Sequence, residues 1–105
     1  MAQFAVYLNK NLKNRAFFPL LVDVQSELLE DLGTRVVIPL AKAVGFTGFP
    51  LGLVMPSLEL EGEKYVLMTP QLAGVSRADL GSQMGGVHDY AQAISKATDL
   101  LLRGF

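Results

Sequence analysis

Leu20-Leu21-Val22-Asp23-Val24-Gln25 and Arg35-Val36-Val37-Ile38-Pro39 are the two stretches that decide the fold of this chain. β-Branched and aliphatic residues dominate both, which is typical of β-strands. We predict one strand from about Leu20 to Gln25 and a second over residues 35–38. The second strand is expected to stop at Pro39, because proline cannot donate to a sheet ladder. Asp23, between two valines, is expected to be the outward residue of an alternating strand. Residues 26–33 form an acidic connection that has room for one helical turn.

Further short strands are predicted on both sides of this pair. Residues 3–8 alternate, with Phe4, Val6 and Leu8 on one face, which indicates a half-buried strand. Residues 45–57 are rich in glycine and proline and predict a long packed loop that leads into a strand at about residues 53–60. Glu61-Gly62 is a hairpin-turn signal, with the returning strand expected over residues 65–69. Residues 76–79 allow a short strand or a turn. The β part is expected to end at the glycines Gly81, Gly85 and Gly86.

From Val87 onward the hydrophobic period becomes helical. Small and apolar residues then fall on one stripe of a terminal helix: Val87, Tyr90, Ala91, Ile94, Ala97, Thr98 and Leu101. Leu100 lies on the opposite, polar side, which predicts a second buried surface such as a dimer contact. Several short antiparallel strands followed by one helix predict a mainly β fold, a small barrel or roll with a C-terminal α-helix.

Composition narrows the class of protein. At 105 residues, half of them hydrophobic, the chain is expected to be a single domain over residues 1–105 with one core. Zero cysteines and one histidine exclude a disulfide scaffold, a thiol nucleophile and a histidine-rich metal site, so no cofactor is expected. A net charge of −1 argues against broad phosphate neutralisation on nucleic acid. No membrane span or signal peptide is recognisable, which favours a cytoplasmic protein. The low charged fraction, 18%, favours an oligomer that hides apolar surface.

Three stretches together resemble the CcdB family, the toxin half of a bacterial toxin–antitoxin pair. They are residues 3–7 (Gln-Phe-Ala-Val-Tyr), the Val-Asp-Val-Gln-Ser run from Val22 continuing to the Val-Ile-Pro-Leu run ending at Leu40, and the helix that ends in Gly104-Phe105. Met68-Thr69 and residues 72–75 also stand in the family's order. The match spans nearly the whole chain, with extra length in the loop near residues 9–18.

The resemblance implies a fold and a mode of action. The fold is a five-stranded SH3-like barrel of the CcdB/MazF type with a small accessory sheet and a C-terminal helix. The family forms homodimers that bind the GyrA subunit of DNA gyrase and trap the enzyme with its DNA cleaved. A CcdA-like antitoxin neutralises the toxin and represses the operon together with it, so DNA is contacted only through that complex. The resemblance implies no catalysis.

The family's gyrase contacts carry over to the end of the helix and to the loop after the Gln-Ser pair. They fall on Ser26, Leu28, Leu29, Asp99, Leu102, Arg103, Gly104 and Phe105. This chain ends in Arg-Gly-Phe where gyrase poisons of the family carry Trp-Gly-Ile, and Asp99 replaces a usual uncharged amide. Arg103 and Gly104 also suit an ordinary helix C-terminus. At least one of Leu28 and Leu29 is expected to be core.

Three questions of partner or activity remain open from the sequence. Lys10, Lys13 and Arg15 are either a solvated loop or the residues that meet an acidic antitoxin segment. MazF/Kid endoribonucleases share the barrel, and their acid–base set would fall on Arg35, Thr34 and His88. Against this alternative, the chain lacks the basic charge of an RNA-binding groove. A solvated residue at the start of the helix is the simpler role for His88. A third hypothesis is a non-toxic relative that only binds antitoxin, motivated by Arg103.

Overall fold

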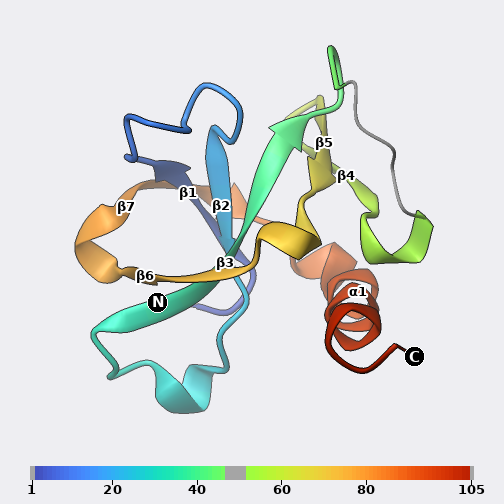
Figure 1. Ribbon diagram of the computed structural model, residues 1–105. Coiled ribbons are helices and arrows are strands. Elements are labelled where there is room, and N and C mark those ends of the chain that lie inside the picture. The colour runs from blue at the N-terminus through green and yellow to red at the C-terminus, as the bar shows by residue number, and fades with distance from the viewer. Residues whose placement is uncertain (1, 47–51, 105) are drawn as a thin grey trace.

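A curled antiparallel sheet with one helix packed against it forms the structure, a computed structural model that describes residues 2–46 and 52–104. Figure 1 shows the sheet bent into a half-barrel, with the helix across one side. Within the described residues the strand order is β4-β5-β3-β2-β1-β7, and β6 pairs with β3. The strands are β1 (Ala5–Asn9), β2 (Leu20–Asp23), β3 (Thr34–Lys42), β4 (Ser57–Leu60), β5 (Glu63–Leu67), β6 (Ala73–Ser76) and β7 (Leu80–Gly86), followed by α1 (Ala91–Arg103). The mainly β class with a C-terminal helix is confirmed.

β3 is the central strand, and it does not stop at Pro39 as predicted. It pairs with β2 on one side and, on the other, first with β6 over residues 34–37 and then with β5 over residues 40–42. Pro39 lies between these two partners, where its carbonyl accepts a hydrogen bond from the Met68 amide at 2.9 Å. The N and O of one residue face the same side of an antiparallel strand, so the missing N–H faces this break. The strand therefore continues without losing a ladder bond.

The central strands β1, β2 and β3 are buried on both faces over most of their length. One cluster, which includes Val22, Ile38 and Leu67, packs beneath Ile94 and Ala97 of α1. A second cluster lies on the other face: Ala5, Tyr7, Leu21, Val37 and Leu80, with Val75 against it. The prediction of a half-buried strand over residues 3–8 is therefore wrong. Ala5 and Tyr7 are also buried, against the second cluster, whereas Leu8, expected on the buried face, is 40% exposed.

The β4–β5 hairpin is confirmed where the turn residues indicated it. Glu61 and Gly62 both have positive φ, 51° and 81°, which is the conformation of a two-residue hairpin turn of type I′. The strand predicted from residue 53 begins only at Ser57, since Gly52–Val54 form a short 3₁₀ turn, η2. The returning strand spans Glu63–Leu67, and residues 47–51 of the predicted loop lie outside the described residues.

The glycines after Asp79 do not end the β part. β7 runs through them and pairs with β1 from Ala5 to Asn9, with two register shifts. A Cβ on Gly81 would lie 2.9 Å from the Cβ of Leu8, so glycine is what allows the two strands to approach. β6 was also not predicted. Residues 76–79, for which either a short strand or a turn was possible, contain a 3₁₀ turn, η4 (Arg77–Asp79), capped by the Ser76 hydroxyl.

The predicted terminal helix is confirmed, with a 3₁₀ turn, η5 (His88–Tyr90), before α1. Val87, Ile94 and Ala97 are buried, as the stripe predicted, whereas Leu101 at the end of the stripe is 37% exposed. Leu100 is half-buried within the single chain, so its place on the polar side does not by itself require a second buried surface. No helix among the described residues has the length and apolar character needed to cross a membrane.

Candidate functional site

The loop between β2 and β3, residues 26–33, exposes two leucines of the predicted site. It begins with Ser26, whose hydroxyl accepts the Leu28 amide at 3.2 Å and caps a single 3₁₀ turn, η1 (Glu27–Leu29). Leu28 is 93% exposed and Leu29 is 50% exposed. The prediction that at least one of them is core is therefore wrong, since the turn projects both away from the sheet.

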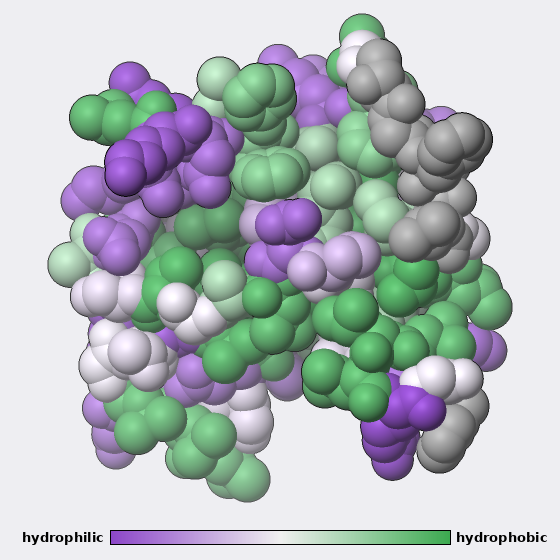
Figure 2. All heavy atoms as spheres, in the orientation of Figure 1, coloured by the Kyte–Doolittle hydropathy of each residue, from purple (hydrophilic) through white to green (hydrophobic). Residues whose placement is uncertain are grey.

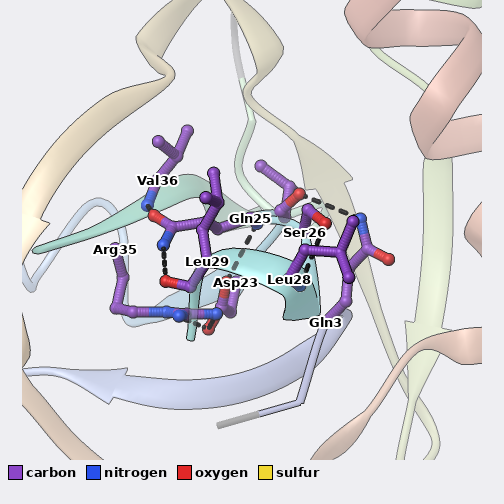
Figure 3. A network of polar contacts seen from close by, with 9 residues as sticks. Gln3, Asp23, Gln25, Ser26, Leu28, Leu29, Arg35 and Val36 are labelled. Carbon is purple, nitrogen blue, oxygen red and sulfur yellow. Dashed lines mark hydrogen bonds and ion pairs between the residues drawn. The ribbon is translucent and has the colours of Figure 1, made fainter. Parts of the chain in front are cut away.

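A buried ion pair lies beneath this loop (Figure 3). Asp23 and Arg35 are both fully buried, and Asp23 Oδ2 lies 2.8 Å from both Nε and Nη2 of Arg35. The prediction that Asp23 is an outward strand residue is therefore wrong. The face it points to is covered by the second hydrophobic cluster, so its charge needs a buried partner. The Nη1 group of Arg35 has no hydrogen-bond partner among the described residues.

Gln25 connects the ion pair to the loop. Its backbone amide donates to Asp23 Oδ1 at 3.0 Å, and its side chain is nearly buried, at 6% exposure. The side-chain Nε2 donates to the Leu29 carbonyl at 2.9 Å, while Oε1 accepts the Val36 amide at 3.0 Å. We call Asp23, Arg35 and Gln25 the polar network. Sequence reasoning missed it, although two polar residues inside a hydrophobic strand run are a signal that could have found it.

The second part of the predicted site is the helix end, residues 99–104. Asp99 and Arg103 form an ion pair one turn apart, with Oδ1 and Nη2 separated by 3.4 Å. Leu102 is 68% exposed. Gly104 ends α1 with a φ of 81°, and its amide donates to the Leu100 carbonyl at 3.0 Å. The predicted contact residue Phe105 lies outside the described residues.

The loop and the helix end lie on the same edge of the molecule in the single chain. Figure 2 shows two lobes along this edge with a hollow between them, and Figure 1 places the residues 26–33 loop in one lobe and the helix end in the other. Both carry exposed aliphatic side chains: Leu28, Leu29, Leu32, Leu101 and Leu102. Exposed aliphatic groups on rigid segments can bind a protein surface, because burying them releases water from apolar area.

The loop with the predicted antitoxin-binding cations, residues 10–19, joins β1 to β2 and lies at the opposite end of the strands from the residues 26–33 loop (Figure 1). Asn9 organises it from within: its Nδ2 donates to Asn14 Oδ1 at 2.9 Å and to the Phe18 carbonyl at 2.8 Å. Lys10 donates to the Ala78 carbonyl at 3.1 Å, while Lys13 and Arg15 are exposed. Beside the loop is a cavity of about 620 Å³, lined mainly by Phe17, Phe18, Pro19, Val44, Phe46 and Lys42.

The residues of the endoribonuclease alternative do not form an acid–base set. Arg35 is fully buried and paired with Asp23, so it cannot contact a substrate at the surface. Thr34 is exposed on β3, where it pairs with Ser76 of β6. His88 is exposed, and its ring lies edge-on to Phe4 with centroids 6.1 Å apart. Among the described residues, no group of three histidine, cysteine or acidic side chains could hold a metal ion.

Solved structures that share this fold are those of small toxins. Mycobacterium tuberculosis toxin MazF-mt6 matches with a TM-score of 0.70 at 13% identity, over 92% of this chain and 94% of that chain. A mycobacterial endoribonuclease in complex with its cognate antitoxin matches with a TM-score of 0.74 at 13% identity, over 97% and 94%. A further structure, described as an Mtb toxin, matches with a TM-score of 0.68 at 14% identity, over 93% and 99%. At these identities the likeness defines the fold and no more.

The family of the chain follows from its sequence rather than from its fold. The family model described as CcdB protein matches residues 3–104, which is nearly the whole chain. The chain therefore belongs to the CcdB family of toxins, and the resemblance found in the sequence is confirmed.

Proposed function

We propose that the protein is the toxin of a type II toxin–antitoxin system that binds the GyrA subunit of DNA gyrase as a homodimer and traps the cleaved DNA complex. The observation that carries the proposal is the exposure of Leu28 and Leu102, 93% and 68%, on the two segments where family members contact gyrase. Each leucine that becomes buried on binding contributes about 1.5–3 kcal/mol. A few such side chains are enough to dominate the energetics of an interface.

Dimer formation would bring these segments together. The resemblance places the two helix ends of the family's dimer near its axis, so each helix end would meet its copy there. The composite surface would then carry two loops and two helix ends in one rigid body. This mode of action needs shape and apolar contact only, and we therefore assign the protein no enzymatic activity of its own.

The two departures from the family's site compensate one another. Arg103 alone would bring a cation to a surface that binds through an uncharged aromatic in gyrase poisons of the family. Asp99, the second departure, lies one turn earlier and pairs with it at 3.4 Å. The pair adds no net charge to the helix end, which supports retention of a gyrase-type target. It also leaves a planar guanidinium that can stack against a flat group of the partner.

We further propose that the residues 10–19 loop binds the acidic segment of a CcdA-like antitoxin, with which the toxin acts as a transcriptional co-repressor in the cytoplasm. Lys10 and Arg15 line a second cavity together with the apolar residues Leu8, Pro19 and Leu80, and Lys13 is exposed on the same loop. An antitoxin segment that combined carboxylates with aliphatic side chains would match both features. DNA would be contacted only through the toxin–antitoxin complex.

The test is controlled expression together with a cleavage assay on gyrase from the species that carries the gene. The wild-type toxin is expected to arrest growth and to increase gyrase-linked DNA cleavage. Leu28→Asp and Leu102→Asp should abolish both effects, because a carboxylate cannot be buried without a partner. Leu12→Asp is the matched control, since Leu12 is 77% exposed but lies in the residues 10–19 loop.

Three other outcomes would contradict the proposal. Growth arrest with no rise in cleavage would refute the gyrase target. Sequence-specific cuts in mRNA by the purified protein would establish the endoribonuclease alternative instead. Efficient transformation without the antitoxin gene would show a non-toxic relative that only binds antitoxin.

A further inference from the structure

We infer that Gln25 is a positioning residue for target recognition: its backbone is held by Asp23, which is paired with Arg35, and its side-chain amide sets the direction in which Leu28 projects. The identity of the target rests on the proposed function, whereas the positioning itself rests on the contacts of this chain. Figure 3 shows the arrangement, with the buried pair beneath the loop and the glutamine between them.

The Gln25 amide connects the outgoing and returning halves of the residues 26–33 loop. Nε2 donates to the Leu29 carbonyl at 2.9 Å, within η1. Oε1 accepts the amide of Val36 at 3.0 Å, after the chain has entered β3. One side chain thus holds η1 at a fixed position relative to the central strand of the sheet.

The other hydrogen bonds of η1 are internal and cannot supply this connection. Ser26 Oγ accepts the Leu28 amide at 3.2 Å, and the Ser26 carbonyl accepts the Leu29 amide at 3.0 Å. The Leu29 carbonyl also accepts the Leu32 amide at 3.2 Å. These bonds define the shape of the turn but not its orientation on the sheet. Leu28 and Leu29 contribute little packing, because both are largely exposed.

Asp23 and Arg35 fix the glutamine in turn. The two carboxylate oxygens of Asp23 have separate roles: Oδ1 accepts the Gln25 backbone amide at 3.0 Å, and Oδ2 accepts Arg35 Nε at 2.8 Å. Both charged side chains are fully buried, so water does not compete for these bonds. Both carboxylate oxygens of Asp23 are thereby satisfied, and satisfied buried hydrogen bonds favour a single geometry. The exposed leucines therefore stand on a rigid base rather than on a mobile loop.

A rigid loop strengthens binding because association requires the contacting residues to be ordered. A loop that is ordered only on binding weakens the complex by the cost of ordering it, and a preorganised loop avoids that loss. Removing the Gln25 amide should therefore weaken target binding through Leu28, although Gln25 itself is nearly buried and does not reach the target.

The experiment uses Gln25→Met, which keeps the length of the side chain and removes both hydrogen bonds. Gln71→Met is the matched control, because Gln71 is exposed on η3 (Thr69–Gln71) and belongs to another part of the surface. Amide hydrogen exchange of Leu28, Leu29 and Val36 is measured by NMR in the free protein. We expect these amides to exchange about tenfold faster or more in Gln25→Met, with that of Ile38 in the core unchanged.

Binding to GyrA is then measured for wild type, Gln25→Met, Leu28→Ala and the double variant. If Gln25 acts through Leu28, each single variant weakens binding by about tenfold and the double variant is little worse than either. Simple additivity of the two losses would overturn the inference, since it would mean that Gln25 contributes by another route. Unchanged loop amides in Gln25→Met would overturn it as well.

The exchange and binding measurements distinguish a failure of the positioning role of Gln25 from a failure of the proposed function. Failure of the wild-type protein to bind GyrA would refute the proposed function and leave the exchange data to decide the positioning role. Wild-type binding with normal exchange in Gln25→Met would refute the positioning role and leave the function intact.

Discussion

Replacing Asp23 by asparagine should destabilise this protein more than its single changed atom suggests. The substitution keeps the shape of the side chain and removes its charge. Arg35, fully buried, would then lose the carboxylate that lies 2.8 Å from both its Nε and its Nη2. Leaving one partner of a buried ion pair uncompensated costs about 3–5 kcal/mol of unfolding free energy.

This loss is large compared with the total free energy of unfolding of a small domain. A domain of this size has about 5–15 kcal/mol of stability, and ~1 kcal/mol shifts the melting temperature of a 60–100-residue domain by about 4–8 °C. The expected fall is therefore at least ~12 °C. Thermal and urea unfolding followed by circular dichroism measure it. Asp31→Asn, at an exposed position in the residues 26–33 loop, is the matched control and should change stability by under ~0.5 kcal/mol.

A second variant distinguishes the charge from the shape of the site. Asp23→Leu combined with Arg35→Met removes both charges, and apolar replacement of a buried pair is often neutral or stabilising. The double variant should therefore be more stable than Asp23→Asn alone. A loss below ~1 kcal/mol in Asp23→Asn, or a double variant no better than the single one, would refute the reasoning that the carboxylate compensates a buried cation.

Three further outcomes are expected. Asp99→Asn should change stability by under ~0.5 kcal/mol, because its ion pair with Arg103 is exposed, yet it should weaken GyrA binding in a salt-dependent manner by removing the carboxylate that pairs with Arg103. Gly81→Ala should destabilise by about 1–3 kcal/mol in urea unfolding, because the new Cβ would lie 2.9 Å from the Cβ of Leu8. Burial, reinforced by the Asp23 carboxylate, raises the pKa of Tyr7 above its usual value of 10.0. The stabilisation linked to Tyr7 is therefore present below pH 10.0 and is lost as pH rises through the folded-state pKa; urea titrations at alkaline pH should show a shallower loss in Tyr7→Phe than in wild type.

The elements that could be predicted from the sequence are those with local causes. The hairpin at Glu61-Gly62 follows from two adjacent residues that adopt positive φ, and α1 follows from a stripe of apolar residues at helical spacing. In each, the signal and the structure occupy the same stretch of chain. The family resemblance extended this local information to the whole fold.

What could not be predicted depends on distant partners. β7 is a strand because β1 lies beside it, although its own sequence is largely glycine and polar residues. Pro39 stays within β3 because two different strands, β6 and β5, follow one another along its open side. Neither fact leaves a trace in the local pattern, because β propensity is set by the surroundings as much as by the residue.

The same limit explains why at least one of Leu28 and Leu29 is predicted to be core, although both are exposed. A leucine after a strand has the same hydrophobicity whether it is buried or offered to a partner. What distinguishes Leu28 is the polar network beneath it, in which Gln25 fixes the turn and Asp23 fixes Gln25. A chain that only needed to fold would have little use for a buried charge pair, because apolar residues of similar size would serve stability as well. A buried charge pair beneath an exposed hydrophobic turn is the arrangement that the proposed positioning role of Gln25 requires.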